Sequence, residues 1–261
     1  MTPARVVAGL EVPANVLVTG ASSGIGLAAV EQLLDNARVG RVVALSRGAD
    51  HHDGLSKLGR AHGDRLRTLS CDITSDADRA TLVARLAAAG VDRLHLLLNC
   101  AGVLHANGVV PEKSLAALRG DALARVFALN AFAPILLVQA LLPLLKYGDP
   151  VVLASLSARV GSIGDNHLGG WYAYRASKAA QNQMFRTLSI EMRRTHPHVA
   201  CVLLHPGTVD TPLSKPFQAG VPPGKLFSAE HSAQRLLLVI AGITPEDSGR
   251  FYAWDGAEIP W

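Results

Sequence analysis

Short apolar runs rich in Val and Leu alternate along this chain with segments of helical periodicity. We expect strands within the runs at 16–20, 41–45, 66–71, 94–98, 150–155 and 199–205, and a seventh at 250–254. Strands buried on both faces of a parallel sheet have continuous apolar sequences of this kind, and intervening helices are typical of βαβ units. The pattern predicts an α/β fold, with a parallel sheet of about seven strands and helices on both of its faces.

The alternation runs from one end of the chain to the other. With 261 residues, of which 49% are hydrophobic and 18% charged, the chain is long enough for one domain with a sizeable core. The Pro/Gly cluster at 221–224 is typical of a surface loop rather than of a linker between domains. We therefore expect a single domain over residues 1–261.

The first apolar run leads directly into a glycine-rich turn and then into a helical segment, 27–34. Gly20, Gly24 and Gly26 permit a tight turn in which a pyrophosphate can approach backbone N–H groups at a helix N-terminus. A glycine triplet alone is weak evidence, but this one follows the first strand, opens the first helix and precedes a second strand. Its position predicts a dinucleotide-binding unit, and hence a Rossmann-type, doubly wound sheet.

A tyrosine and a lysine stand four residues apart in the segment 171–178. Helical spacing places Tyr174 and Lys178 on one face. A cation near a phenol favours the ionised phenol and makes the group usable for proton transfer near neutrality, so the pair is a candidate acid/base. The same spacing also arises where a tyrosine edges the core and a lysine lies in solvent. Tyr172, with no lysine four residues on, is the natural control.

Further marks follow in order along the chain. Asp72 follows the third expected strand, Asn-Cys-Ala-Gly at 99–102 follows the fourth, Asn130 lies on the next helix, and Pro-Gly-Thr-Val-Asp-Thr at 206–211 follows the sixth. With the glycine turn and the Tyr/Lys pair, these segments resemble the short-chain dehydrogenase/reductase family over nearly the whole chain. The segments 161–178 and 205–207 are most similar to the branch of the bacterial C-factor proteins and the insect carbonyl reductase sniffer. The resemblance implies a nicotinamide-dependent oxidoreductase that forms a homodimer or homotetramer.

The resemblance also implies roles for individual residues. Lys178 is expected to bind the nicotinamide ribose as well as to act on Tyr174, and Asn130 to hold a relaying water through a distortion of its helix. An ordinary helical polar residue is the alternative for Asn130, and a turn or helix-starting residue is the alternative for Asp72, the expected adenine partner. Expected cofactor-binding residues are Gly20, Ser22, Ser23, Gly24, Ile25, Gly26, Ser46, Arg47, Asp72, Ile73, Asn99, Ala101, Gly102, Tyr174, Lys178, Pro206, Gly207, Val209 and Thr211.

The catalytic serine is where the chain departs from the family pattern. The family serine that bonds the substrate carbonyl lies three residues before a glycine, and counting back from Gly161 leads to Ala158. Ser157 is one position early, so its hydroxyl faces the opposite side unless the strand has ended or bulged there. We nominate Ser157, with Ser155 and Ser162 as alternates.

The end of the second strand indicates the cofactor. An acidic residue there would hold the ribose hydroxyls of NAD, whereas this chain has Ser46 and Arg47. A hydroxyl and a guanidinium can bind a 2′-phosphate through charge-assisted hydrogen bonds, so NADP(H) is favoured over NAD(H). Asp50 and Asp53 follow and could still serve NAD, and Arg47 could be an ordinary loop charge.

Composition excludes several other classes of function. The ten histidines form none of the spaced pairs typical of zinc sites, and we expect no metal. A formal charge of +4, spread without aromatic interleaving, favours a solvated surface over nucleic-acid binding. We expect no signal peptide, no membrane helix and a cytoplasmic location, with the apolar stretch 131–145 as a buried or subunit-facing helix. Cys71, Cys100 and Cys201 are expected to be core thiols.

Two other functions stay open. The protein could bind nucleotide as a signalling or scaffold protein with little turnover, which the displaced serine favours and the intact Tyr/Lys pair disfavours. It could also work in the direction of alcohol oxidation with NAD as the acceptor, because the same residues catalyse both directions. The variable loops 104–112, 164–170 and 211–228 contain no charge cluster that demands a phosphate or carboxylate. The expected small-molecule substrate is therefore a fairly apolar ketone, aldehyde or secondary alcohol.

Overall fold

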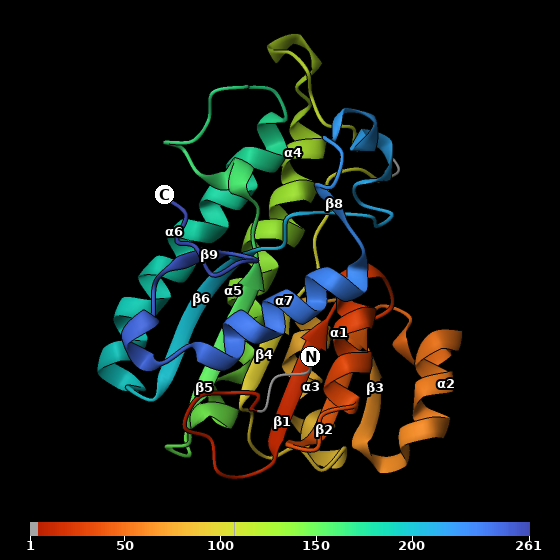
Figure 1. The fold of residues 1–261 in the computed structure, drawn as a ribbon, viewed down its shortest axis with the longest axis vertical. Helices are drawn as coiled ribbons and strands as arrows, with labels where there is room; N and C mark the ends of the chain where they lie inside the picture. The colour runs from red at the N-terminus through yellow and green to blue at the C-terminus, as the bar shows by residue number, and fades with distance from the viewer. Residues whose placement is uncertain (1–4, 107) are drawn as a thin grey trace.

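Seven parallel strands form one central sheet in the computed structural model, which describes residues 5–106 and 108–261 (Figure 1). The sheet order is β3-β2-β1-β4-β5-β6-β9, and every neighbouring pair is parallel. The strands are β1 (Ala14–Thr19), β2 (Val39–Ser46), β3 (Leu66–Ser70), β4 (Leu96–Asn99), β5 (Val151–Leu156), β6 (Val199–His205) and β9 (Phe251–Ala253). The predicted doubly wound fold is confirmed. The part of the loop 104–112 at residue 107, and the N-terminal tip, lie outside the described residues.

Helices cover both faces of the sheet. In Figure 1, α1 and α7 lie in front of the strands, whereas α5 and α6 lie behind them. The α-helices are α1 (Gly24–Leu34), α2 (Asp53–His62), α3 (Asp76–Ala88), α4 (Gly120–Phe127), α5 (Ala133–Leu141), α6 (Tyr172–Thr195) and α7 (Ala229–Gly242). All seven strands are parallel, so each connection must bring the chain back to the same end of the sheet before the next strand begins. The helices between the strands form these crossover connections.

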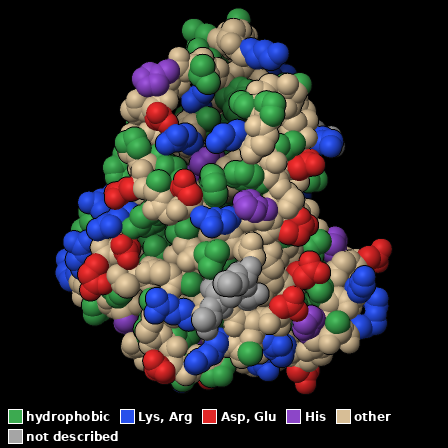
Figure 2. Space-filling view, viewed as in Figure 1, with side chains coloured by type: hydrophobic (Ala, Val, Ile, Leu, Met, Phe, Trp, Pro, Cys, Tyr) green, Lys and Arg blue, Asp and Glu red, His purple; other side chains and the backbone are tan. Residues whose placement is uncertain are grey.

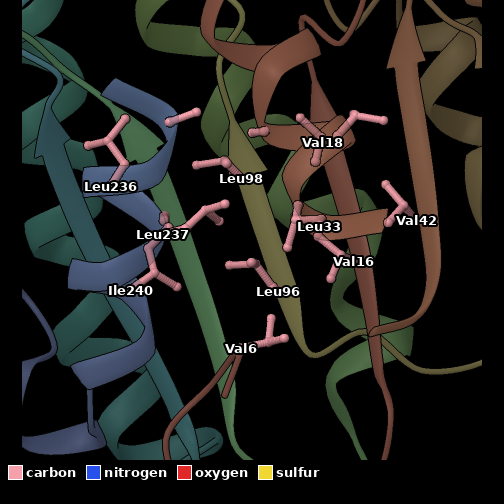
Figure 3. Close-up of a cluster of buried hydrophobic side chains, with 14 of the residues drawn as sticks. Val6, Val16, Val18, Leu33, Val42, Leu96, Leu98, Leu236, Leu237 and Ile240 are labelled. Carbon is pink, nitrogen blue, oxygen red and sulfur yellow. The ribbon is translucent and has the colours of Figure 1, made fainter. Parts of the chain in front are cut away.

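Two apolar clusters hold these layers together. Figure 3 shows the first, in which Val16 and Leu96 from the sheet face Leu33 of α1 and Leu236 of α7. Neighbouring strand residues such as Leu17 point to the other face and join the second cluster beneath α3, α5 and α6. Alternate residues of one strand thus enter different clusters, which is why the strands are apolar throughout.

The central position of β1 determines where a ligand can bind. The chain runs from β1 outward through β2 to β3, then crosses back to β4 on the other side of β1. The loops that leave the carboxyl ends of β1 and β4 therefore diverge and leave a crevice between them, the usual ligand site in such sheets. Both the glycine turn and the segment 99–102 begin there.

One long apolar helix corrects an expectation from the sequence. Residues Gly120–Leu145 form a continuous helix of 26 residues with a mean hydropathy of 2.0, long and apolar enough to cross a membrane. The expected buried or subunit-facing helix covered only the second part of it, 131–145. Half of its apolar window is buried, and Leu137 and Leu141 pack in the second cluster, so this part of the helix belongs to the core. On the face drawn in Figure 2, acidic and basic side chains are interspersed.

Candidate active site

The predicted catalytic pair lies on the first two turns of α6. Tyr174 is 9% exposed and Lys178 is 3% exposed, whereas Tyr172 is 42% exposed. The Nζ atom of Lys178 lies 5.9 Å from the centroid of the Tyr174 ring. The helix thus turns one tyrosine and the lysine inward together and leaves the neighbouring tyrosine outside. The alternative of a solvated lysine is excluded by its burial.

Burial dominates the electrostatics of the pair. It raises the pKa of the Tyr174 phenol above its ordinary value and lowers the pKa of Lys178 to about 7. The sequence suggested that the cation would favour an ionised phenol, but the loss of hydration outweighs that attraction here. Tyr174 is therefore protonated at neutral pH, the form that a proton donor requires.

The start of α6 is fixed by a residue from a distant loop. The backbone carbonyl of Glu112 accepts a hydrogen bond from Trp171 N at 2.5 Å, and Glu112 Oε2 accepts one from Ala173 N at 3.2 Å. Glu112 is buried, and its negative charge lies at the positive end of the helix dipole. It satisfies N–H groups that a helix start otherwise leaves unpaired, in the turn that carries Tyr174.

Asn130 lies in a short π-helical segment, Ala128–Phe132, between α4 and α5. Its Oδ1 accepts from Val103 N and its Nδ2 donates to Val103 O, both at 2.8 Å, and Nδ2 also donates to Ser177 Oγ at 3.1 Å. The expected distortion of the helix is present, because a π-turn shifts the backbone hydrogen bonds by one residue. Asn130 thereby ties the loop after β4 to the catalytic helix.

Each of the three candidate serines has a partner. Ser157 Oγ donates to Asn182 Oδ1 at 2.6 Å, Ser155 Oγ accepts from Asn99 and Gln181, and Ser162 Oγ accepts from Asp165 N. Strand β5 pairs in continuous register and ends at Leu156, so Ser157 lies just beyond the strand without a bulge in its pairing. Its role toward a substrate stays a prediction.

The glycine turn has the geometry that the motif predicts. Gly20 and Gly24 have φ angles of +63° and +49°, which side-chain-bearing residues rarely adopt. A Cβ on Gly26 would lie 2.3 Å from the Gly20 carbonyl oxygen, and one on Gly24 would lie 2.9 Å from Thr211. Ser23 is the N-cap of α1, with Ser22 before it and Ile25 on the first turn. The structure thus places Thr211 against the turn despite a sequence separation of 187 positions (211 − 24).

Residues at the end of β4 join the turn to the catalytic helix. Asn99 is fully buried and bonds both Thr19 of β1 and Ser155 of β5. The backbone N–H of Ala101 donates to Thr19 Oγ1 at 3.3 Å, and a Cβ on Gly102 would lie 3.4 Å from Asn130 Oδ1 and 3.7 Å from Lys178 Nζ. This loop therefore lies against both the end of β1, where the glycine turn begins, and Lys178 on the catalytic helix.

The end of β2 carries the residues expected to select the cofactor. Ser46 Oγ is buried and has no hydrogen-bond partner within the part of the chain that the structure describes, and Arg47 beside it is exposed. Asp50 is occupied elsewhere, since its Oδ2 accepts from Ser70 N at 3.1 Å. Asp72 Oδ1 accepts from Thr74 N and Oγ1, the turn geometry expected as its alternative role. Ile73 beside it is buried.

The segment after β6 closes the other side. Gly207 has a φ of +80°, and a Cβ there would lie 2.7 Å from the Phe227 ring. Thr208–Val209 forms β7, which pairs with β8 (Leu226–Phe227) in a small ribbon that the sequence did not predict. Pro206 O accepts from Ser232 Oγ at 2.9 Å, which anchors the segment to α7.

Aromatic side chains lie beside Tyr174. The Trp171 ring contacts the Tyr174 ring at 6.2 Å between centroids and the Phe217 ring at 5.1 Å, and Phe217 contacts His105 at 5.8 Å. We call Trp171, Phe217 and His105 the aromatic wall. They come from three loops, so no local sequence signal joins them, although all three lie in or next to the loops expected to line the substrate pocket.

The chemistry of this crevice fits a nicotinamide dinucleotide. The glycine turn forms a cradle for an anion. The Ser46 hydroxyl, which has no partner among the described residues, offers a donor on the ribose side. The buried Lys178 offers a charged donor near Tyr174. No group of three or more His, Cys, Asp or Glu residues that could hold a metal occurs among residues 5–106 and 108–261. Cys71 and Cys201 are buried, and burial raises the pKa of the partly exposed Cys100 thiol to about 12.

Comparisons with known proteins show the family of this chain. The family model described as short chain dehydrogenase matches residues 14–221. A 1-hydroxy-2-glutathionyl-2-methyl-3-butene dehydrogenase of Rhodococcus sp. (strain AD45) is 34% identical over 249 residues, covering 95% of this chain and 99% of the relative. The C-signal protein of Myxococcus xanthus is 41% identical over 139 residues, covering 53% of this chain and 78% of that protein.

Two solved structures have the same fold. The NADPH-bound carbonyl reductase from chicken fatty liver matches with a TM-score of 0.82 and 29% identity, covering 97% of this chain and 100% of that one. The carbonyl reductase Sniffer of D. melanogaster matches with a TM-score of 0.83 and 26% identity, covering 96% and 100%. Sequence, fold and site geometry thus lead to one conclusion: the chain is an enzyme of the short-chain dehydrogenase/reductase family.

Proposed function

We propose that this enzyme is an NADP(H)-dependent carbonyl reductase that acts on apolar ketones or aldehydes, or on the corresponding secondary alcohols in reverse. The observation that carries the proposal is the buried pair of Tyr174 and Lys178 beside the glycine turn. The NADPH-bound carbonyl reductase with a similar fold supports it. We further propose a cytoplasmic location and a homodimeric or homotetrameric assembly.

A reduced nicotinamide, when bound, supplies the hydride. Tyr174 donates its phenolic proton to the alkoxide oxygen as the carbonyl carbon accepts hydride, so no charged alkoxide is released. Lys178 holds positive charge close to the phenol and stabilises the phenolate that remains. Asn130 bonds both the loop after β4 and Ser177 of α6, and so holds this loop in a fixed position relative to Lys178.

The preference for NADP(H) rests on the end of β2. Ser46 offers a buried hydroxyl without a partner in the described chain, and Arg47 adds a charged donor next to it. Of the two carboxylates that could serve NAD, Asp50 accepts a backbone hydrogen bond from Ser70, and Asp53 lies exposed on the first turn of α2. A 2′-phosphate therefore has two donors at this strand end.

The substrate proposal rests on the aromatic wall. Trp171 and Phe217 present apolar ring surface next to Tyr174, and such surface binds apolar or planar groups by burial and ring contact. Among the described residues of the loops that contribute these side chains, no cluster of like charges occurs. An apolar carbonyl compound therefore suits this pocket better than a phosphorylated or carboxylated one.

A second candidate is a nucleotide-binding signalling protein with little turnover. The specific observation in its favour is that Ser157 donates to Asn182, while Ala158 occupies the position of the family serine. The C-signal relative also fits this reading. Under it, the protein binds NADPH with little turnover.

A panel of apolar ketones, aldehydes and quinones, assayed in parallel with NADPH and NADH, separates the candidates. We expect oxidation of NADPH with at least one carbonyl class and a higher kcat/KM with NADPH than with NADH. Tight NADPH binding without turnover on any substrate would favour the second candidate. A higher kcat/KM with NADH would contradict the cofactor proposal.

A further inference from the structure

A chain of buried polar side chains leads from Lys178 across the sheet to β1. Its members are Gln181 of α6, Ser155 of β5, Asn99 of β4 and Thr19 of β1, all fully buried. Amides and hydroxyls at such depth are costly unless each finds a partner. Each of the four residues is hydrogen-bonded to the next, and Lys178 lies at the end of this network that faces the active site.

The bonds are short and connect successive elements. Lys178 Nζ donates to Gln181 Oε1 at 3.1 Å and to the Leu156 carbonyl oxygen at 2.8 Å. Gln181 Nε2 donates to Ser155 Oγ at 2.6 Å, and Asn99 Nδ2 donates to the same oxygen at 2.7 Å. Thr19 Oγ1 in turn bonds Asn99 Oδ1. The network therefore spans three adjacent strands and the catalytic helix.

The orientation of the Gln181 amide follows from its neighbours. An ammonium has three donors and no acceptor, so the Gln181 oxygen must face Lys178 and the amide nitrogen must face Ser155. Ser155 then fixes the amide from the sheet side. Gln181 thus presents a rigid, neutral acceptor to a charged group that has lost nearly all of its water.

Two of the three ammonium donors are directed by this arrangement. The Leu156 carbonyl and Gln181 Oε1 set the tetrahedral orientation of the Lys178 ammonium, and hence the direction of the remaining N–H. Gly102, whose Cβ would lie 3.7 Å from Nζ, leaves space on the side of the nucleotide crevice. A donor aimed there can reach a ribose hydroxyl.

We propose that Gln181 is a positioning residue: held by Ser155, it aims the ammonium of Lys178 at the nucleotide ribose and keeps it charged next to Tyr174. It acts through Lys178 and not on the substrate. The activity readout rests on the proposed reductase function. The binding readout rests only on the proposed binding of NADPH, which the second candidate function shares.

Two substitutions of similar size change the acceptor in opposite ways. Gln181→Leu removes the acceptor oxygen, and Gln181→Glu replaces it with a carboxylate. The matched control is Gln183→Leu, because Gln183 lies on the same helix but is exposed, and its side-chain amide donates to Thr187. Thermal unfolding and circular dichroism of the full-length variants establish that each is folded.

The first readout is the dissociation constant for NADPH, measured by fluorescence titration without any carbonyl substrate. We expect Gln181→Leu to weaken binding about threefold to tenfold, the range of one ordinary hydrogen bond, because Gln181 acts on the nucleotide only through Lys178. Gln183→Leu should bind like the wild type. This readout tests the proposal even where the enzyme reduces no carbonyl compound tried.

The second readout is the pH dependence of kcat/KM, whose alkaline limb reports loss of the Lys178 charge. The titratable groups that face Lys178 are Tyr174 of its own helix and Cys100 after β4, and burial raises the pKa of both. The alkaline limb should move to lower pH in Gln181→Leu, since the charged form loses an acceptor, and to higher pH in Gln181→Glu, since it gains an opposite charge.

The proposal would be supported if the alkaline limb moved in opposite directions in Gln181→Leu and Gln181→Glu, and if Gln181→Leu bound NADPH more weakly than the wild type. It would be overturned if Gln181→Leu had the NADPH affinity of the wild type and an alkaline limb at the same pH as the wild type. Shifts in the same direction in both variants, together with lower melting temperatures, would also overturn it, because a merely structural role predicts that result.

Discussion

Burial governs the chemistry of Lys178 more than any charged neighbour does. Desolvation lowers its pKa to about 7, so the ammonium is present below that pH and is lost as the pH rises through it. In the unfolded chain the lysine stays protonated to a much higher pH, so burying the charge costs stability below pH 7, and this cost is relieved toward pH 10. The acceptors Leu156 and Gln181 offset part of that cost.

Ser157 provides a prediction at the level of one hydroxyl. In the structure it donates its proton to Asn182, so it can serve a carbonyl only by rotating away from that partner. We predict that Ser157→Ala costs about 2–4 kcal/mol of transition-state stabilisation, the range for loss of one oxyanion-type donor. The measurement is kcat/KM relative to the wild type, with Ser162→Ala measured beside it as the alternate candidate. Undiminished turnover with a lowered melting temperature would show that Ser157 serves only the fold.

Arg47 provides a second prediction. Arg47→Asp exchanges a partner of the 2′-phosphate for a carboxylate that repels phosphate and can accept from ribose hydroxyls. We expect the ratio of kcat/KM for NADPH to that for NADH to fall. Arg67→Asp, on β3, is the control for a general change of charge. A ratio equal to that of the wild type would remove Arg47 from the cofactor site.

At the scale of elements, the loop between β7 and α7 bears on substrate choice. It contains a short helix, Lys215–Gly220, that carries Phe217 to Trp171. We predict that Phe217→Ala raises KM for aryl ketones severalfold while leaving small aliphatic aldehydes nearly unaffected, because ring contact is lost and the acid/base pair is not. Steady-state kinetics on the two substrate classes check this. An equal change for both would mean that Phe217 shapes the loop and not the pocket.

The elements differ in how far the sequence could predict them. The seven strands and the glycine turn follow from local apolar runs and from positions that only glycine tolerates. The Glu112 cap on α6 carries no local signal, because the glutamate and the helix start are 61 positions apart. The same holds for the aromatic wall. Gln181 was within reach, since a polar residue three positions after Lys178 shares its helix face.

At the scale of the whole molecule, topology brings the site together. The crossover that places β4 beside β1 puts the glycine turn, the loop after β4 and α6 around one crevice. Thr211, which follows β6 and β7, packs against the glycine turn from the other side. The parallel sheet was predictable because each strand is apolar throughout. The pKa shifts of Tyr174 and Lys178 were not predictable, because they depend on how deeply the finished fold buries the two side chains.

The most direct test of the account compares two tyrosines that differ only in where the fold places them. Tyr174→Phe removes the transferable proton and little packing, whereas Tyr172→Phe alters an exposed ring on the same helix turn. We predict that Tyr174→Phe nearly abolishes carbonyl reduction, with NADPH binding close to that of the wild type, and that Tyr172→Phe has a mild effect. Equal effects of the two substitutions on kcat would contradict the assignment of Tyr174 as the acid.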